Sequence, residues 1–307
     1  MQKNLSVTSS PHIRSSASTR RIMQEVCIAL APAGIAGIVL FGGGAASLIA
    51  VSVISCVISE YLFQRINHQK ITTGDWSAVV TGLLLAYNLP ANAPLWLAAI
   101  GGIIAIVLVK QCFGGIGCNF MNPALTARAI LFVSWAGLMC NYPKTVFMSD
   151  AASSATPLLQ LQNGSSVRFM DLLIGNCGGV LGETCKIAII AGGIYLIIRR
   201  IADWRIPLAF ILSVFICYTI QNGVEFSVYQ LFSGGVMLGA FFMATDYATS
   251  PITSAGRIIM GIGCGVLLFV IRSYASYIEG CSFAILFMNV LTPMIDRFTR
   301  GKSFGEA

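Results

Sequence analysis

The segment IMQEVCIALAPAGIAGIVLF, residues 22–41, decides the structural class of this protein. It is about twenty residues long, and an apolar helix of that length crosses the roughly 30 Å hydrocarbon core of a bilayer. Comparable segments recur along the whole chain. The sequence therefore predicts an all-α integral membrane protein with about ten transmembrane helices, at about 22–41, 44–63, 76–90, 93–109, 123–140, 170–198, 206–222, 228–245, 257–273 and 281–296.

The composition supports this class. Of 307 residues, 56% are hydrophobic and 10% are charged, with a mean hydropathy of +0.80, whereas soluble domains carry about 25% charged residues. The apolar segments leave no room for a separate soluble domain. We interpret residues 22–298 as a single polytopic domain between terminal tails at 1–21 and 299–307. The first segment lacks a small-residue cleavage site, so we expect it to remain as a membrane anchor.

Glycine and proline mark the weakest of these predicted helices. The segments 76–90 and 228–245 are short or interrupted by glycine, and 170–198 is long enough to contain a break around Gly175 to Gly182. Breaks of this kind are common where membrane proteins bind ligands.

The basic residues predict the orientation, because Lys and Arg near helix ends stay on the cytoplasmic side. If both termini are cytoplasmic, the loop 141–169 is external and most of the basic residues face inward. The net charge of +7 then needs no nucleic-acid partner to explain it. The residues placed inside are Lys3, Arg14, Arg20, Arg21, Arg65, Lys70, Lys110, Arg199, Arg200, Arg205, Arg257, Arg297, Arg300 and Lys302.

Internal similarity divides the chain into two halves. Residues 82–88 resemble 239–245, and residues 110–120 resemble 272–283, which pairs Cys118 with Cys281. Each half, about 22–140 and 170–298, has an odd number of predicted crossings, so the second repeat would be inverted relative to the first. Inverted repeats also suit a solute channel or transporter without a cofactor, and fold alone does not decide between these functions.

The external loop contains a candidate modification site. The segment Asp150-Ala-Ala-Ser-Ser-Ala-Thr156 lies directly before Pro157. It is a run of small residues whose last member, Thr156, carries a hydroxyl, and the acid Asp150 lies six positions upstream of it. A modifying enzyme needs such a small-residue strand to reach a threonine. Thr156 is thus a candidate attachment point for a phosphorylated cofactor, with Asp150, Ser153, Ser154 and Ala155 as its motif. A plain Ser/Thr-rich surface loop is the alternative.

Ionisable residues at membrane depth are costly and usually have a partner or a function. Glu183 and Lys186 are three residues apart, so on one helical face they would neutralise each other, as a structural or a functional pair. Asp75 and Asp246 occupy comparable cytoplasmic helix ends in the two halves. Asp246 would either hold a polar ring edge of a ligand or cap the next helix.

Asn119 and Asn122 form a second polar cluster before Pro123. Their amides present donors and acceptors that would match the polar edge of a ligand ring. Helix-end capping is an equally good explanation of both residues.

Other cofactor classes find little support in the sequence. None of the ten cysteines forms a Cys-x-x-Cys pair, and we expect most of them to lie within apolar helices as small hydrophobic residues. We expect no metal site, no iron–sulfur cluster and no catalytic residue. No GxGxxG or P-loop motif occurs either, so NAD chemistry would belong to a partner.

Several segments taken together resemble one family, the D subunits of the Rnf electron-transport complex, which are similar to the B subunit of the sodium-pumping NADH:quinone reductase. The resemblance runs from about residue 10 to 300 in one order. The reductase protein usually carries a longer N-terminal extension, which favours the Rnf relationship. The segments are Ser10–Arg14, Arg21–Met23, Gly115–Pro123, Ser153–Pro157, Asp203–Pro207, Ala244–Thr253 and Met288–Asp296.

The resemblance implies two flavins. In this family FMN is joined by its phosphate to a threonine within a pattern like Asp-x-x-Ser/Thr-Gly-Ala-Thr/Ser, which implies covalent FMN on Thr156. Ser154 stands where glycine is often found. A second, non-covalent flavin, riboflavin, is implied on the cytoplasmic side, and we place it near Asn119, Asn122, Thr245 and Asp246.

The resemblance also implies the setting. The chain would pass electrons across a bacterial cytoplasmic membrane in a ferredoxin:NAD oxidoreductase coupled to Na⁺ or H⁺ export, with Thr156 acting as an anchor only. Its partners would be membrane lipid, a flavin transferase and the A, B, C, E and G subunits of the Rnf complex, with the flavin-bearing G outside and the NAD-handling C inside. A scaffold whose partners do all the chemistry is a further alternative.

Overall fold

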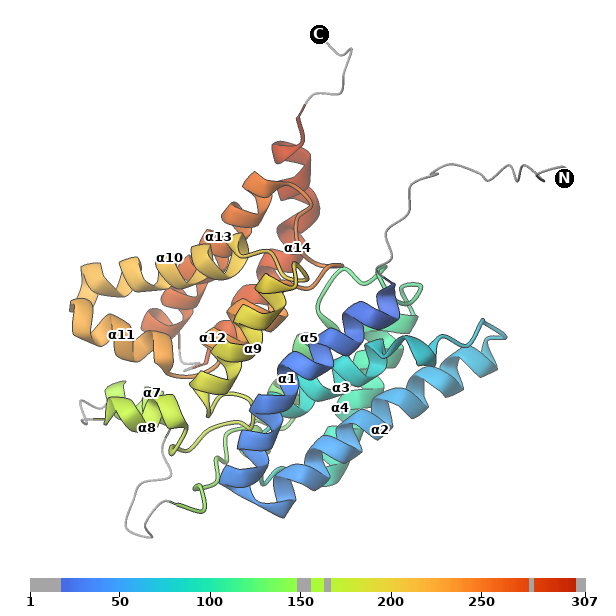
Figure 1. Ribbon diagram of the computed structural model, residues 1–307, viewed down its shortest axis with the longest axis horizontal. Coiled ribbons are helices and arrows are strands. Elements are labelled where there is room, and N and C mark those ends of the chain that lie inside the picture. Colours follow the sequence, from blue (N-terminus) through green and yellow to red (C-terminus); the bar gives the residue numbers. More distant parts are fainter. Residues whose placement is uncertain (1–17, 148–155, 163–166, 276–278, 302–307) are drawn as a thin grey trace, which may run out of the picture.

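The long apolar segments fold into helices that run between two ends of the molecule (Figure 1). The computed structural model describes residues 18–147, 156–162, 167–275 and 279–301. Five of its helices are long and apolar enough to cross a membrane, since 18 residues already extend about 27 Å. They are α1 (Thr19–Phe41), α2 (Gly43–Ile66), α10 (Arg205–Asn222), α13 (Ser254–Tyr274) and α14 (Cys281–Thr299).

The other apolar segments form shorter or bent helices. The pair α11 (Val224–Phe232) and α12 (Val236–Leu238), the latter continued by the π-helical η3 (Gly239–Met243), bends by 69° at residues 233–235 and makes a sixth candidate span. The shorter apolar helices are α3 (Ser77–Tyr87), α4 (Leu95–Ile103) with the π-helical η2 (Ile104–Gln111), α5 (Pro123–Ser134) and α9 (Lys186–Ile198).

The all-α membrane class is confirmed, while the expected number of about ten transmembrane helices is not shown. Within the described chain, five or six helices are long and apolar enough to cross a membrane. The predicted helix 123–140 ends at Ser134, because Trp135 leaves the helical conformation. Four short elements complete the described chain: η1 (Thr73–Asp75), α6 (Ala136–Met139), α7 (Pro157–Gln162) and α8 (Phe169–Ile174).

The predicted segment 170–198 contains the break that was expected around Gly175 to Gly182. It is split into α8 and α9, because Gly175 adopts a left-handed conformation and ends α8. The connecting residues form a turn against the end of α3, where Leu181 N–H donates to the Leu89 carbonyl at 3.2 Å and Gly182 N–H donates to the Tyr87 carbonyl at 2.8 Å. Non-helical backbone is tolerated at membrane depth where protein buries it. Leu89 and Leu181 are fully buried.

The two halves of the chain pack through matching helices. α1 packs against α9 and α5 packs against α14, while α2 lies against α3 and α4, and α10 lies against α13. The start of α1 and the end of α14 lie at one end of the molecule, called here the terminus end, and α7 and α8 lie at the opposite end (Figure 1). The inverted relation of the two halves stays a prediction.

A carboxylate ties α10 to α13 at the terminus end. Asp203 accepts hydrogen bonds from the Arg205 N–H at 2.9 Å and from the guanidinium groups of Arg205 and Arg257. Burial alone would raise the pKa of Asp203, but these hydrogen bonds outweigh it and hold the pKa below its usual range. The charged form of Asp203 is therefore the one that the folded state stabilises.

This pairing predicts a pH-dependent contribution to stability. Because the folded-state pKa of Asp203 is depressed, its stabilisation is present above the unfolded pKa of about 3.9 and is lost as pH falls through the folded value. We expect Asp203→Asn to lower the Tm at pH 7 by an amount equivalent to about 1 kcal/mol or less, since the pair is partly exposed. The gap to the parent chain should close below about pH 4. A gap of constant size, or the same behaviour in Asp171→Asn at the other end, would contradict this.

Candidate functional site

A cavity of about 400 Å³ lies at the terminus end, where α1, α3, α9 and the loops after η2 and η3 converge. Its volume is within the usual range for small-molecule sites, about 300–1,000 Å³. Apolar side chains form most of its wall, among them Ile22, Met23, Val80 and Phe242. Such a wall suits a flat, largely apolar ligand with a polar edge.

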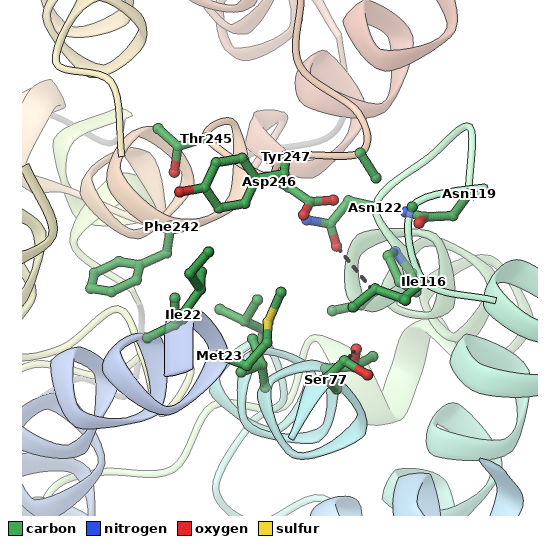
Figure 2. Close-up of a pocket in the computed structure, with 18 of the residues that line it drawn as sticks. Ile22, Met23, Ser77, Ile116, Asn119, Asn122, Phe242, Thr245, Asp246 and Tyr247 are labelled. Atoms are coloured by element: carbon green, nitrogen blue, oxygen red, sulfur yellow. Dashed lines mark hydrogen bonds between the residues drawn. The ribbon is translucent and has the colours of Figure 1, made fainter. Parts of the chain in front are cut away.

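All four residues predicted for a second flavin line this one cavity: Asn119, Asn122, Thr245 and Asp246. Figure 2 shows these polar side chains along one side, with Ile22, Met23 and Ser77 on the facing side. They come from the loop before α5 and the loop after η3, more than 120 residues apart in the chain. The fold therefore brings the two predicted clusters together.

Asn122 has a structural role as well. Its side-chain oxygen accepts from the N–H groups of Ala124 at 3.1 Å and Leu125 at 3.3 Å, which caps α5. Its amide nitrogen donates to the Met243 carbonyl at 3.3 Å and so joins the two halves. The capping explanation of Asn122 is confirmed, and capping does not prevent the residue from lining the cavity.

Asp246 does not cap the next helix, because Thr253 is the N-cap of α13. The Asp246 carboxylate instead accepts from the Thr249 hydroxyl at 3.3 Å within its own turn. Burial raises the pKa of Asp246, against hydrogen bonds from Thr249 and Asn119 that lower it. Asp75, its predicted counterpart, accepts from the Ser77 N–H at 2.8 Å and hydroxyl at 2.6 Å at the start of α3.

A buried ion pair at the cavity wall was not predicted from the sequence. Lys110, predicted as a surface charge that sets the orientation, is 3% exposed and lines the cavity. Its ammonium lies 2.8 Å from the Glu60 carboxylate and 2.5 Å from the Ser77 hydroxyl. Glu60 is 1% exposed and also accepts from the Gln111 amide at 2.7 Å. An acid within the apolar helix α2 was the signal available in the sequence.

Thr156 lies at the opposite end, where its hydroxyl accepts from the Leu159 N–H at 3.4 Å at the start of α7. The side chain is 4% exposed and borders a cavity of about 10 Å³. That space is too small for a flavin ring, so an attached FMN would require the hydroxyl to turn outward. The predicted motif residues Asp150, Ser153, Ser154 and Ala155 lie outside the described residues.

The buried charges near Thr156 form a network that differs from the predicted pair. Glu183 precedes α9 rather than lying on it, and its carboxylate is 3.7 Å from the Arg128 guanidinium. Lys186, the first residue of α9, donates to the Gly234 carbonyl. Both still border the small cavity next to Thr156. A buried ammonium there is suited to an anionic phosphodiester.

Arg128 is the centre of this network. Its guanidinium donates to Asn88 at 3.0 Å, to Ser282 at 2.7 Å and to Glu279. The arginine lies on α5 and is 6% exposed, whereas Glu279 and Ser282 flank the start of α14. One side chain therefore links three segments across the interface of the two halves.

The positions of the cysteines differ from the prediction that most of them lie within helices. Only five of the ten lie within helices, not most of them; the others occupy turns, caps and extended segments. Cys118 is exposed in a loop, whereas Cys281 is buried at the start of α14, so the matched repeat positions have different surroundings.

Comparison with known proteins shows which family the chain belongs to. The model of the NQR2, RnfD, RnfE family matches residues 6–305. This chain belongs to that family. Its relatives include the D subunit of the Na⁺-translocating ferredoxin:NAD⁺ oxidoreductase complex of Acetobacterium woodii, which is 50% identical over 98% of this chain and 96% of the relative.

Two further relatives show the breadth of the family. The D subunit of the proton-translocating ferredoxin:NAD⁺ oxidoreductase complex of Clostridium ljungdahlii is 39% identical over 99% of this chain and 98% of the relative. The D subunit of the ion-translocating oxidoreductase complex of Stutzerimonas stutzeri is 38% identical over 94% of this chain and 93% of the relative. The relatives are thus subunits of oxidoreductase complexes, and their names assign different ions.

Proposed function

We propose that this chain is the membrane electron-transfer subunit of an ion-translocating ferredoxin:NAD⁺ oxidoreductase, with FMN bound covalently to Thr156 and riboflavin in the cavity at the terminus end. The observation that carries the proposal is the convergence of Asn119, Asn122, Thr245 and Asp246 on one cavity of about 400 Å³. Bound flavins supply one- and two-electron exchange, and the protein supplies binding, orientation and electrostatics.

The residues of the cavity have distinct tasks in this proposal. Asn119 and Asp246 hold the polar edge of the ring, because an amide and a carboxyl group offer complementary donors and acceptors. Met23 and Phe242 cover its apolar surface and exclude water. Lys110 places a positive charge in the wall, and Glu60 balances that charge when the cavity is empty of anions.

The two proposed flavin positions lie at opposite ends of the molecule (Figure 1). With the terminus end in the cytoplasm, Thr156 lies on the outer side of the bacterial cytoplasmic membrane. Electrons would then pass between the two sides of that membrane. Partner proteins at each face, the C and G subunits of the Rnf complex, would exchange electrons with these positions, and a flavin transferase would load Thr156. The exported ion is Na⁺ or H⁺, as in the two named relatives.

Filling the cavity should remove only the non-covalent flavin. We expect Met23→Trp to lower the flavin released by acid precipitation by about tenfold or more, because overpacking costs about 1–3 kcal/mol and 1.4 kcal/mol corresponds to a factor of ten. The covalent flavin on the precipitated chain should be unchanged. Mass spectrometry of the two fractions measures both quantities.

Ile35→Trp is the matched control, since Ile35 lies on the same helix, is 63% exposed and does not line the cavity. Released flavin at the parent level in Met23→Trp would place the second flavin elsewhere. A parent chain that releases no flavin and shows no visible absorption would favour the channel or transporter interpretation of the fold instead.

A further inference from the structure

A groove with a regular construction runs along the membrane-facing side of α10 and α13. It encloses about 470 Å³ and contains almost no polar surface other than Arg205 and Ser213. Its walls are two rows of branched side chains at every fourth position, which on a helix form one continuous ridge. The rows are Leu208, Leu212 and Ile216 on α10, and Ile258, Ile262 and Val266 on α13.

Small residues hold the two ridges close together. A Cβ atom on Gly261 would lie 2.7 Å from the Ala209 side chain, and one on Gly265 would lie 1.8 Å from the Ser213 hydroxyl. The two helices therefore approach at their backbones, and the branched side chains stand out on either side. From Leu208 to Ile216 the groove extends about 12 Å along α10, at 1.5 Å per residue. Its shape is that of a slot for a chain of methylene groups.

The groove ends in a polar recess at the terminus end. Trp204 borders both, and the recess encloses about 380 Å³ lined by Arg200, Arg257, Tyr247 and Ser250. Trp and Arg at the first turn of a transmembrane helix are typical of the membrane–water interface. The recess is thus at headgroup depth, and the groove is at acyl-chain depth.

The charges around the recess are unbalanced. Arg205 and Arg257 share the single carboxylate of Asp203, while none of the ion pairs among the described residues includes Arg200. Arg200, Arg257 and Asp203 line the recess, and Arg205 lines the adjoining end of the groove, so three guanidinium groups face one carboxylate at this junction. Arginine is the residue best matched to phosphate oxygens.

We propose that the groove and the recess together bind one anionic phospholipid, with an acyl chain between α10 and α13 and the phosphate at Arg200 and Arg205. The site selects an anionic headgroup because a zwitterionic one leaves the positive charge of the recess uncompensated. This inference does not depend on either flavin.

Quenching of Trp204 by brominated lipids tests the site. The full-length chain with Trp76→Phe, Trp96→Phe and Trp135→Phe keeps Trp204 as its one tryptophan. It is reconstituted in two sets of phosphatidylcholine vesicles. One set contains brominated phosphatidylglycerol, and the other contains the same fraction of brominated phosphatidylcholine. We expect the anionic lipid to occupy the site about five times more strongly than the zwitterionic one for each arginine that contacts its phosphate.

Arg200→Gln should lower this preference for the anionic lipid by about fivefold. Arg200 has a positive φ of 57°, and glutamine meets the same backbone strain as arginine, so the substitution adds no new folding cost. Arg200→Lys should keep the preference. Arg300→Gln removes one exposed charge at the same end, away from the groove, and should leave the preference unchanged.

Three results would overturn the proposal. The first is equal quenching by the two lipids in the parent chain. The second is an equal loss of preference in Arg200→Gln and Arg300→Gln, which would indicate a general charge effect. The third is quenching by neither lipid when the chain is measured in its intact complex, which would show that a protein partner covers the groove.

Discussion

We expect Thr156→Val to remove the covalently bound flavin completely. Valine has nearly the shape of threonine but lacks the hydroxyl that would form the phosphodiester. The measurement is the fluorescent band of the chain on a denaturing gel, together with the intact mass of the protein. The side chain also accepts a hydrogen bond from Leu159 N–H, and the loss of such a cap typically costs about 1 kcal/mol, so the chain should still fold.

Thr145→Val is the matched control. Thr145 is another buried threonine, and its hydroxyl hydrogen-bonds to Asn176 at 2.6 Å. It should keep the full fluorescent band, and Thr156→Ser should keep at least part of it. A band of parent intensity in Thr156→Val would refute the attachment at this residue.

The second large effect is expected at Arg128. Arg128→Met leaves Glu279 without its cation and leaves Glu183 buried without the guanidinium 3.7 Å away. Breaking a buried ion pair on one side typically costs about 3–5 kcal/mol. We expect a large drop in the thermal stability of the detergent-solubilised chain, measured as the temperature at which half of the protein leaves the monodisperse peak in size-exclusion chromatography.

Two variants separate this effect from loss of packing. Arg128→Met combined with Glu279→Gln should recover part of the stability, because it removes one of the two carboxylates that lose their cation, while Glu183 stays charged and buried. Arg168→Met, an exposed arginine before α8, should change stability by less than about 0.5 kcal/mol. An Arg128→Met chain as stable as the parent would show that the halves are held together by other contacts.

Length and apolar composition were enough to predict the membrane class and the places of the long helices. The predicted segments at 22–41, 206–222 and 257–273 agree with α1, α10 and α13 within a few residues. Such helices satisfy their own backbone hydrogen bonds, so their sequences carry the information needed. The grouping of Asn119, Asn122, Thr245 and Asp246 came from the family resemblance, and the fold places all four around one cavity, while their role as a flavin site stays a prediction.

The remaining features depend on partners far away in the chain. The break around 175–182 was predicted from its glycines, but the hydrogen bonds that hold its turn against Tyr87 and Leu89 were not. Lys110 has the pattern of an interfacial charge, and only Glu60 explains its burial. Glu183 and Lys186 do interact electrostatically. Their spacing did not predict the contact of Glu183 with α5 or that of Lys186 with the Gly234 carbonyl. Sequence spacing does not reveal such tertiary contacts.

The turn before α9 supplies hydrogen-bond partners to the end of α3. The carbonyls of Tyr87 and Leu89 receive their partners from Gly182 and Leu181, about 90 residues later in the chain. At about 5–20 residues per second, the ribosome needs roughly 5–20 s to make that stretch. An unpaired backbone group in hydrocarbon costs several kcal/mol. The end of α3 therefore reaches its native hydrogen bonding only after residues 181 and 182 have been made.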